Sequence, residues 1–99
     1  MPKSKPNAFL YPYAWDDFNR LPGNVRRQIT VTINALAKNP RPSASKQLDI
    51  PGETMEVRRF SMGHWRIIYT MENEQAMIIT IRRRPPYDYE DLENLLKGL

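Results

Sequence analysis

The fold is decided by residues 65–82, which read Trp65-Arg66-Ile67-Ile68-Tyr69-Thr70-Met71, then Glu72-Asn73-Glu74-Gln75, then Ala76-Met77-Ile78-Ile79-Thr80-Ile81-Arg82. The first and third groups are rich in β-branched and aromatic side chains, which favour strands. The second group is polar and has the composition of a turn. Because so short a connection joins antiparallel neighbours, the stretch predicts a β-hairpin.

Upstream, apolar residues recur at helical spacing in two segments, and each segment stops at a proline-containing signal, Pro22-Gly23 or Asn39-Pro40. These patterns, with Asn24 as a possible N-cap, predict the following order: a mobile tail over 1–7, a strand over 9–11, helices over 13–21 and 24–38, a proline-containing loop over 39–54, and a strand over 55–60. After the hairpin, Asp88 offers an N-cap for a C-terminal helix that contains Leu92, Leu95 and Leu96.

Segregated helices and strands predict an α+β domain. We expect a small antiparallel twisted sheet, made of the N-terminal strand plus a three-stranded meander. The two N-terminal helices are predicted to pack on one face, with a short C-terminal helix completing the fold. Ninety-nine residues make a single domain, residues 1–99.

The composition excludes several classes of site. The chain has no cysteine and one histidine, so neither a disulfide framework nor a zinc site is expected, and no cofactor is predicted. No apolar run reaches the roughly 20 residues of a membrane span, and the N-terminal apolar stretch is too short for a signal sequence. We therefore expect a soluble cytoplasmic protein with no membrane partner.

The chain is basic, with 15 Lys and Arg against 11 Asp and Glu. Such a surplus suits a polyanionic partner, although it does not distinguish DNA, RNA and acidic protein. Strand alternation places Arg66 opposite in direction to Trp65 and Ile67. If Phe60 shares the core with Ile67, then Arg59 projects from the same outer face as Arg66. The tryptophans are predicted to lie in the core.

A cluster of three arginines, Arg82, Arg83 and Arg84, closes the last strand and precedes Pro85-Pro86-Tyr87-Asp88-Tyr89. Guanidinium groups are too costly to bury without partners, so the cluster emerges at the rim of the sheet. Together with Arg59 and Arg66, it suits a phosphate-bearing ligand whose bases stack on the tyrosines.

Alternative interpretations stay open for these residues. The arginines could instead form separate salt bridges with Glu53, Glu56, Glu72 or the acidic C-terminal segment. His64, in the turn between two strands, could act as a base or contact a phosphate, or it could be a solvated polar residue. One of Tyr87 and Tyr89 could anchor the C-terminal helix.

Four stretches, in this order and spacing, resemble toxins of the RelE/ParE superfamily of bacterial type II toxin–antitoxin pairs. They are Leu21-Pro22 with Val25-Arg26-Arg27-Gln28-Ile29 and Asn39-Pro40-Arg41-Pro42; Lys46-Gln47-Leu48; Gly63-His64-Trp65-Arg66-Ile67-Ile68-Tyr69; and Ile79-Thr80-Ile81-Arg82-Arg83-Arg84 followed by a tyrosine. The resemblance covers nearly the whole chain.

This resemblance implies a RelE-like ribonuclease that cleaves mRNA in the ribosomal A site of the 30S subunit without a metal, and that is silenced by a cognate antitoxin. It implies catalytic roles for Arg59, Arg66, Arg84 and Tyr89, with Arg83 and Tyr87 as alternatives for the last two. Further RNA contacts are implied by their place beside this set: Lys46, Arg58, His64, Arg82, Arg83 and Tyr87.

Two departures from the family pattern affect this expectation. Ser61 stands where the better-known nucleases have a second basic residue, and Pro85-Pro86 is unusual, so the general base is left open. Two other functions therefore remain as alternatives: a ParE-like inhibitor of DNA gyrase, and a non-catalytic basic module that binds protein or nucleic acid.

Overall fold

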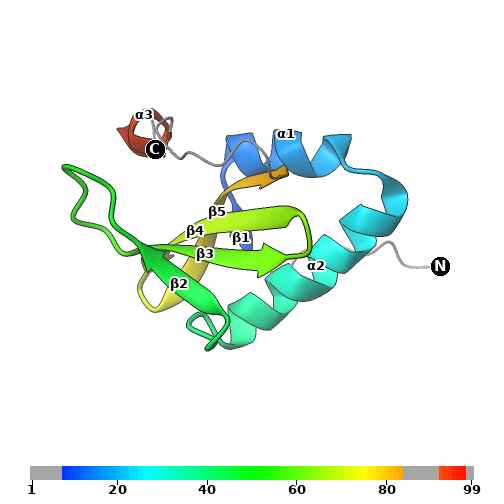
Figure 1. Ribbon diagram of the computed structural model, residues 1–99, viewed down its shortest axis with the longest axis horizontal. Helices are drawn as coiled ribbons and strands as arrows, with labels where there is room; N and C mark the ends of the chain where they lie inside the picture. Colours follow the sequence, from blue (N-terminus) through cyan, green and yellow to red (C-terminus); the bar gives the residue numbers. More distant parts are fainter. Residues whose placement is uncertain (1–7, 84–91, 98–99) are drawn as a thin grey trace.

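The computed structural model of the protein describes residues 8–83 and 92–97 (Figure 1). Its centre is a five-stranded sheet with the strand order β1-β5-β4-β3-β2. The strands are β1 (Phe9–Leu10), β2 (Ser45–Leu48), β3 (Val57–Met62), β4 (Trp65–Glu72) and β5 (Gln75–Arg83). β1 runs parallel to β5, whereas the other neighbours are antiparallel. The predicted α+β class and the three-stranded meander are confirmed.

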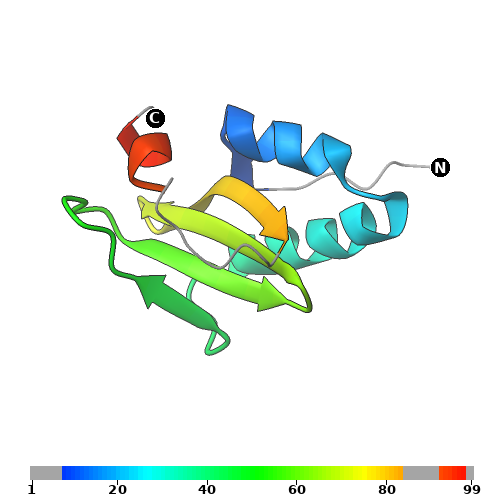
Figure 2. The ribbon, with the colours of Figure 1, turned by 45° about the horizontal axis from the view of Figure 1, so that its top comes forward.

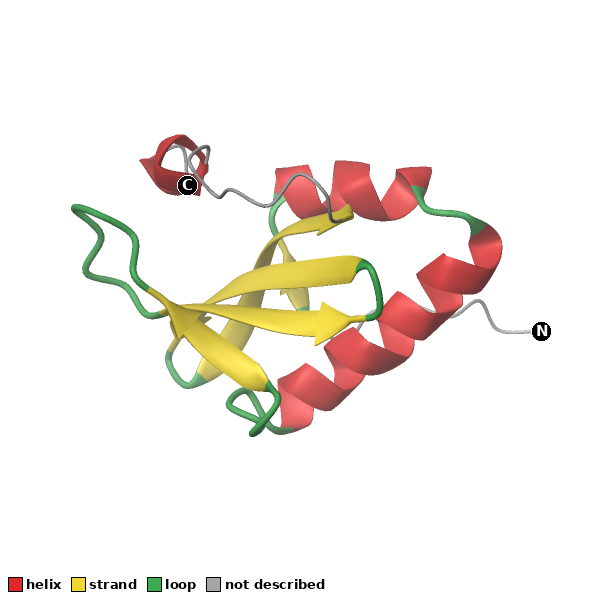
Figure 3. Ribbon diagram, in the orientation of Figure 1, coloured by secondary structure: helices red, strands yellow, loops and turns green. Residues whose placement is uncertain are grey.

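Helices α1 (Pro12–Arg20) and α2 (Gly23–Lys38) precede the meander, and α3 (Leu92–Lys97) follows it (Figure 3). α1 begins at Pro12, where the missing N–H of proline costs no helical hydrogen bond. α2 begins directly after Pro22, so Asn24 lies inside the helix and its predicted capping role is wrong. None of the helices in the described residues has the length and apolar character needed to cross a membrane.

The sheet has two different faces. On the face called here the helix-packed face, Ile67 and Tyr69 of β4 pack with Ile29 and Ile33 of α2 in the larger core cluster. On the opposite face, called here the α3 face, a smaller cluster joins three strands to α3 through Val57, Ile68, Ile79, Leu92 and Leu96. In Figures 1 and 2, α3 lies at the end of the sheet away from the β3–β4 turn, so it covers only part of its face.

Turn geometry and one bulge set the register of the meander. Gly63 has φ 58° in the β3–β4 turn, and Asn73 and Glu74 have φ 53° and 62° in the two-residue β4–β5 turn. Two consecutive positive φ values match the type I′ turn that suits a twisted hairpin. Farther along, Ile68 pairs with Thr80 and Tyr69 with Ile78, which leaves Ile79 as an extra residue in β5. The bulge turns Ile79 toward α3.

The prediction of a loop over residues 39–54 is wrong for β2, which pairs with β3 as an edge strand. Its central residues Lys46 and Gln47 are exposed, so the segment lacks the apolar alternation that marks a strand. Buried Ser45 anchors it instead: the Ser45 hydroxyl donates to the Pro42 carbonyl at 2.8 Å and accepts from Arg58 at 2.9 and 3.0 Å. Strand β3 also begins two residues later than predicted, at Val57.

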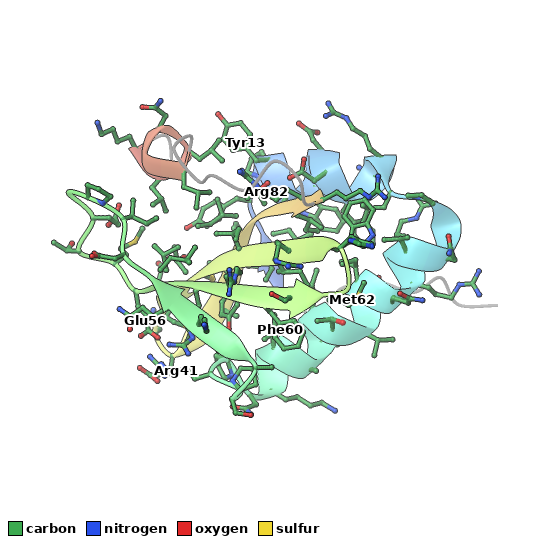
Figure 4. All side chains as sticks on the ribbon, viewed as in Figure 1. Tyr13, Arg41, Glu56, Phe60, Met62 and Arg82 are labelled. Atoms are coloured by element: carbon green, nitrogen blue, oxygen red, sulfur yellow. The ribbon has the colours of Figure 1, made fainter. Side chains whose placement is uncertain are left out.

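An ion-pair network joins three distant segments at one corner of the sheet (Figure 4). Arg41, in the loop after α2, donates to both carboxylate oxygens of Glu56 at 2.9 Å and to Glu74 in the β4–β5 turn at 2.7 Å. The hydrogen bonds from Arg41 lower the pKa of Glu56 and of Glu74. Protonation of either carboxylate therefore weakens the link between this loop and the meander.

We expect Arg41→Ala to lower the melting temperature by a few degrees at pH 7. A carboxylate whose pKa is lower in the folded chain stabilises the fold above its unfolded value, near 4.5, and this contribution is lost as the pH falls through the folded value. The difference between wild type and variant should therefore shrink from pH 7 to pH 3 in thermal denaturation followed by circular dichroism. Arg27→Ala, an exposed change on α2, is the control. A difference that stays constant over this range would contradict the assigned role.

Candidate nucleic-acid interface

Basic side chains gather on the part of the α3 face that α3 leaves open. The register places Ser61, Arg66 and Arg82 in one row across β3, β4 and β5, and it places Lys46 opposite Arg59 on β2 and β3. Neighbouring strands lie about 4.8 Å apart, and diagonal side chains such as Arg59 and Arg66 are about 7–8 Å apart. The predicted convergence of Arg59 and Arg66 on one face is therefore present in the structure.

Two of these arginines have hydrogen-bonding capacity that the protein leaves unused. The Nε atoms of Arg59 and Arg66 are buried, and no described group accepts a hydrogen bond from either. Arg66 is oriented by its Nη1, which donates to the carbonyls of Gly63 at 2.8 Å and Trp65 at 2.9 Å. A buried donor without an acceptor costs about 1–3 kcal/mol, which is tolerated where the group has another purpose.

Arg58 and its neighbour in sequence, Arg59, differ in whether they form an ion pair. Arg58 points to the other face, where its Nη1 donates to Glu56 at 3.0 Å and its other nitrogens contact Ser45. The alternative of a salt bridge to Glu56 is thus found for Arg58. Among the described residues, no ion pair involves Arg59 or Arg66. Like charges on one open face repel, so the arrangement suits a ligand with several negatively charged oxygens.

The remaining predicted site residues divide into three groups. His64 is exposed in the β3–β4 turn, next to the Gly63 carbonyl that holds Arg66. Arg83 is also exposed but pairs with Trp65, and therefore lies on the helix-packed side of the sheet end. The predicted site residues Arg84, Tyr87 and Tyr89 lie outside the described residues. Within residues 8–83 and 92–97, no group of His, Asp and Glu side chains is suited to hold a metal ion.

A pocket at the open edge of β5, here called the edge pocket, was not predicted from the sequence. It has a volume of about 330 Å³ and is lined by Asp17, Arg20, Leu21, Trp65, Ile81, Arg82 and Arg83. Asp17 gave no signal because an acidic residue on an amphipathic helix is typical of a solvated position. Trp65 packs partly against the larger core as predicted, whereas Trp15 is 42% exposed, so its predicted core position is wrong.

Comparison with solved structures shows a shared fold. A chain of the RelE–RelB complex from Pyrococcus horikoshii matches with a TM-score of 0.66 and 17% identity, over 83% of this chain and 98% of that one. The isolated RelE toxin of E. coli matches with a TM-score of 0.64 and 17% identity, over 92% and 95%. A toxin–antitoxin complex from Mycobacterium tuberculosis matches with a TM-score of 0.65 and 18% identity, over 81% and 100%.

Comparison at the level of sequence shows the family. A search of curated protein sequences gives no match. The model of the ParE toxin of the type II toxin–antitoxin system parDE, by contrast, matches residues 10–85, which span the chain from β1 to just beyond β5. The chain therefore belongs to the RelE/ParE superfamily and is a toxin of a type II toxin–antitoxin system.

Proposed function

We propose that the protein is a ribosome-dependent endoribonuclease that stops translation by cutting mRNA. The observation that carries the proposal is the arginine row on the α3 face, where Arg59 and Arg66 are partly exposed and form no ion pair with a described residue. Lys46 and Arg82 flank them in the register of the sheet. A phosphodiester offers the negatively charged oxygens that unpaired guanidinium groups bind.

Metal-free cleavage is the chemistry that this face supports. The ribose 2′-hydroxyl loses its proton and attacks the adjacent phosphorus. The 5′-oxygen of the next nucleotide leaves and takes up a proton, so that a 2′,3′-cyclic phosphate and a 5′-hydroxyl remain. Negative charge increases on the phosphate oxygens during the attack, and prepositioned guanidinium groups stabilise it. In this scheme Arg66 and Arg59 bind the reacting phosphate.

Proton transfer requires a base and an acid near this phosphate. His64 and Lys46 border the arginine row in the structure. Tyr89, with Tyr87 as its alternative, is the proton-transfer candidate that the family resemblance supplies, and Arg84 is the further phosphate ligand. Four residues at the rim are assigned to RNA binding: Lys46, His64, Arg82 and Arg83. Arg58 is assigned a structural role instead, because Glu56 and Ser45 hold its guanidinium group.

A cognate antitoxin is the protein partner that we propose. The matched structure from Pyrococcus horikoshii is a RelE–RelB complex, and the one from Mycobacterium tuberculosis is a toxin–antitoxin complex. An antitoxin that covers the arginine face would separate it from RNA. Because the proposed target is translating ribosomes, we also propose a cytoplasmic location.

The decisive experiment is induction of the chain without antitoxin, followed by primer extension on a translated mRNA and on the same mRNA without its start codon. We expect cleavage of the translated message alone. Cleavage of both messages would indicate a ribonuclease that does not need the ribosome. Intact mRNA would refute the nuclease proposal.

Two observations favour a second function, inhibition of DNA gyrase. The matching family model is that of ParE toxins rather than of the nuclease branch, and Ser61 occupies the row of Arg66 where a basic residue is implied for the nucleases. Gyrase inhibition predicts induction of the DNA-damage response, with mRNA left intact. Measuring a damage-response reporter in the same induced cultures separates the two functions. Normal growth would instead support a non-catalytic binding module.

A further inference from the structure

The edge pocket lies beside the end of β5, where this strand pairs with β4 but no longer with β1. β1 pairs with β5 only at Met77 and Ile78, so the strand beyond them has an open edge. Asp17 of α1 compensates: its Oδ2 accepts a hydrogen bond from the Thr80 hydroxyl at 2.5 Å and from the Ile81 N–H at 3.0 Å. This pair of bonds fixes the carboxylate between helix and sheet. Both bonds use Oδ2, and no described residue donates to Oδ1.

The walls of this pocket combine three kinds of recognition group. Trp65 supplies an aromatic surface, and its cross-strand partner Arg83 supplies an exposed guanidinium group. Arg20, in the last turn of α1, supplies a second guanidinium group. Neither Arg20 nor Arg83 forms an ion pair with a described residue. Asp17 is the acceptor among these donors.

A single nucleobase matches this set in size and in chemistry. About 330 Å³ is at the lower end of the volumes of ligand pockets, which run from roughly 300 to 1,000 Å³. Bases stack on aromatic side chains, and arginine donates to the O6 and N7 acceptors of guanine. Guanine also has N–H groups on its Watson–Crick edge, and these can donate hydrogen bonds to a carboxylate. Uracil and adenine each lack part of this combination.

We propose that the edge pocket binds a guanine base of the RNA, next to the nucleotide whose linkage lies on the arginine face. The inference rests on the proposed nuclease function and adds a base-specific subsite to it. Arg82 connects the two regions, because it lines the pocket and also lies opposite Arg66 in the row on the α3 face. Trp65, which lines the pocket, directly precedes Arg66 in β4. Consecutive Cα atoms are about 3.8 Å apart, so a neighbouring nucleotide reaches around the sheet edge.

The test is a titration of the purified full chain with the 5′-monophosphates of guanosine, adenosine, cytidine and uridine, followed by NMR. We expect GMP to shift the indole N–H signal of Trp65 and to bind at least tenfold more tightly than AMP or UMP. Trp15 does not line the pocket, so its indole signal is an internal reference, assigned with Trp15→Phe. Inorganic phosphate, which can occupy the arginine face alone, should leave the Trp65 signal in place.

Asp17→Asn tests the specificity. The amide oxygen can still accept from Thr80 and Ile81, but an NH2 group replaces the acceptor that faces the base. We expect GMP binding to weaken tenfold or more and UMP binding to change less than threefold. Asp16→Asn, on an exposed position of the same helix, is the matched control. Thermal denaturation of each variant verifies that the fold is retained, and Arg83→Ala replaces Asp17→Asn if that variant unfolds.

The outcomes separate this inference from the nuclease proposal. If translated mRNA is cut but GMP leaves the Trp65 signal unchanged at 10 times the concentration at which other nucleotides are tested, the base pocket is refuted and the nuclease stands. Equal affinity for all four nucleotides refutes guanine specificity. GMP binding in a chain that leaves mRNA intact refutes a role of the pocket in mRNA cleavage.

Discussion

Arg66→Ala is expected to abolish the growth arrest caused by the toxin while the fold is retained. Removing one prepositioned donor from developing negative charge typically costs a factor of about 100–1,000 in rate. The hydrogen bonds that Arg66 donates end on the carbonyls of Gly63 and Trp65 at the β3–β4 turn, which water can serve instead. Colony counts after induction, combined with primer extension on a translated mRNA, measure the effect.

Thermal stability distinguishes a ligand-binding arginine from a structural one. Arg66 stands directly opposite Arg82 in the register, and like charges in this position are destabilising. Loss of the Arg66 charge should therefore leave the melting temperature unchanged or raise it. Residues that are retained for function often lower the stability of the fold in this way. Arg66→Lys keeps the charge but lacks the guanidinium fork, and should have intermediate toxicity. Arg27→Ala is the control for lost positive charge on another surface. Full toxicity of Arg66→Ala would refute the proposed role.

Ile33→Ala is expected to be the most destabilising of the substitutions considered. Ile33 is fully buried in the larger core cluster, where α2 packs on the sheet. Truncating a buried isoleucine to alanine costs about 2–5 kcal/mol. For a domain of this size, that loss lowers the melting temperature by roughly 10–30 °C. Urea unfolding at 25 °C, followed by circular dichroism, gives the change in the free energy of unfolding.

The same helix provides the control. Val31 is 69% exposed and lies two residues from Ile33, so Val31→Ala removes side-chain atoms that are mostly in water. Its free energy of unfolding should stay within about 0.5 kcal/mol of wild type, as for ordinary surface substitutions. Equal losses for the two variants would mean that α2 does not pack on the sheet through this face.

Local patterns in the sequence predicted most of the fold. Helical spacing of the apolar residues defined α1 and α2 to within one residue, because each buries a continuous stripe. The alternation along β3 and β4 placed Arg59 and Arg66 on one face, because successive side chains of a strand point to opposite sides. Short polar turns fixed the antiparallel order of the meander. Each of these features depends on neighbours within a few residues.

Features that depend on distant contacts were not accessible to the same reasoning. β2 is a strand because it pairs with β3 and because Ser45 is bound by Arg58, whereas its own side chains are polar. The bulge at Ile79, which sends this residue toward α3, results from the register between two strands and leaves no trace in apolar alternation.

The sequence by itself determined the α+β class, the order of the elements and the basic face that makes nucleic acid a suitable partner. Only the tertiary structure decided which arginines are available to a ligand: Arg58 is neutralised by Glu56, whereas its neighbour Arg59 has no ionic partner among the described residues. Only the tertiary structure, too, brought Asp17 to Thr80, which are 63 residues apart, and so formed the edge pocket. The physical reason is that charge pairing and pocket shape depend on through-space distances, which the period of a helix or a strand does not encode.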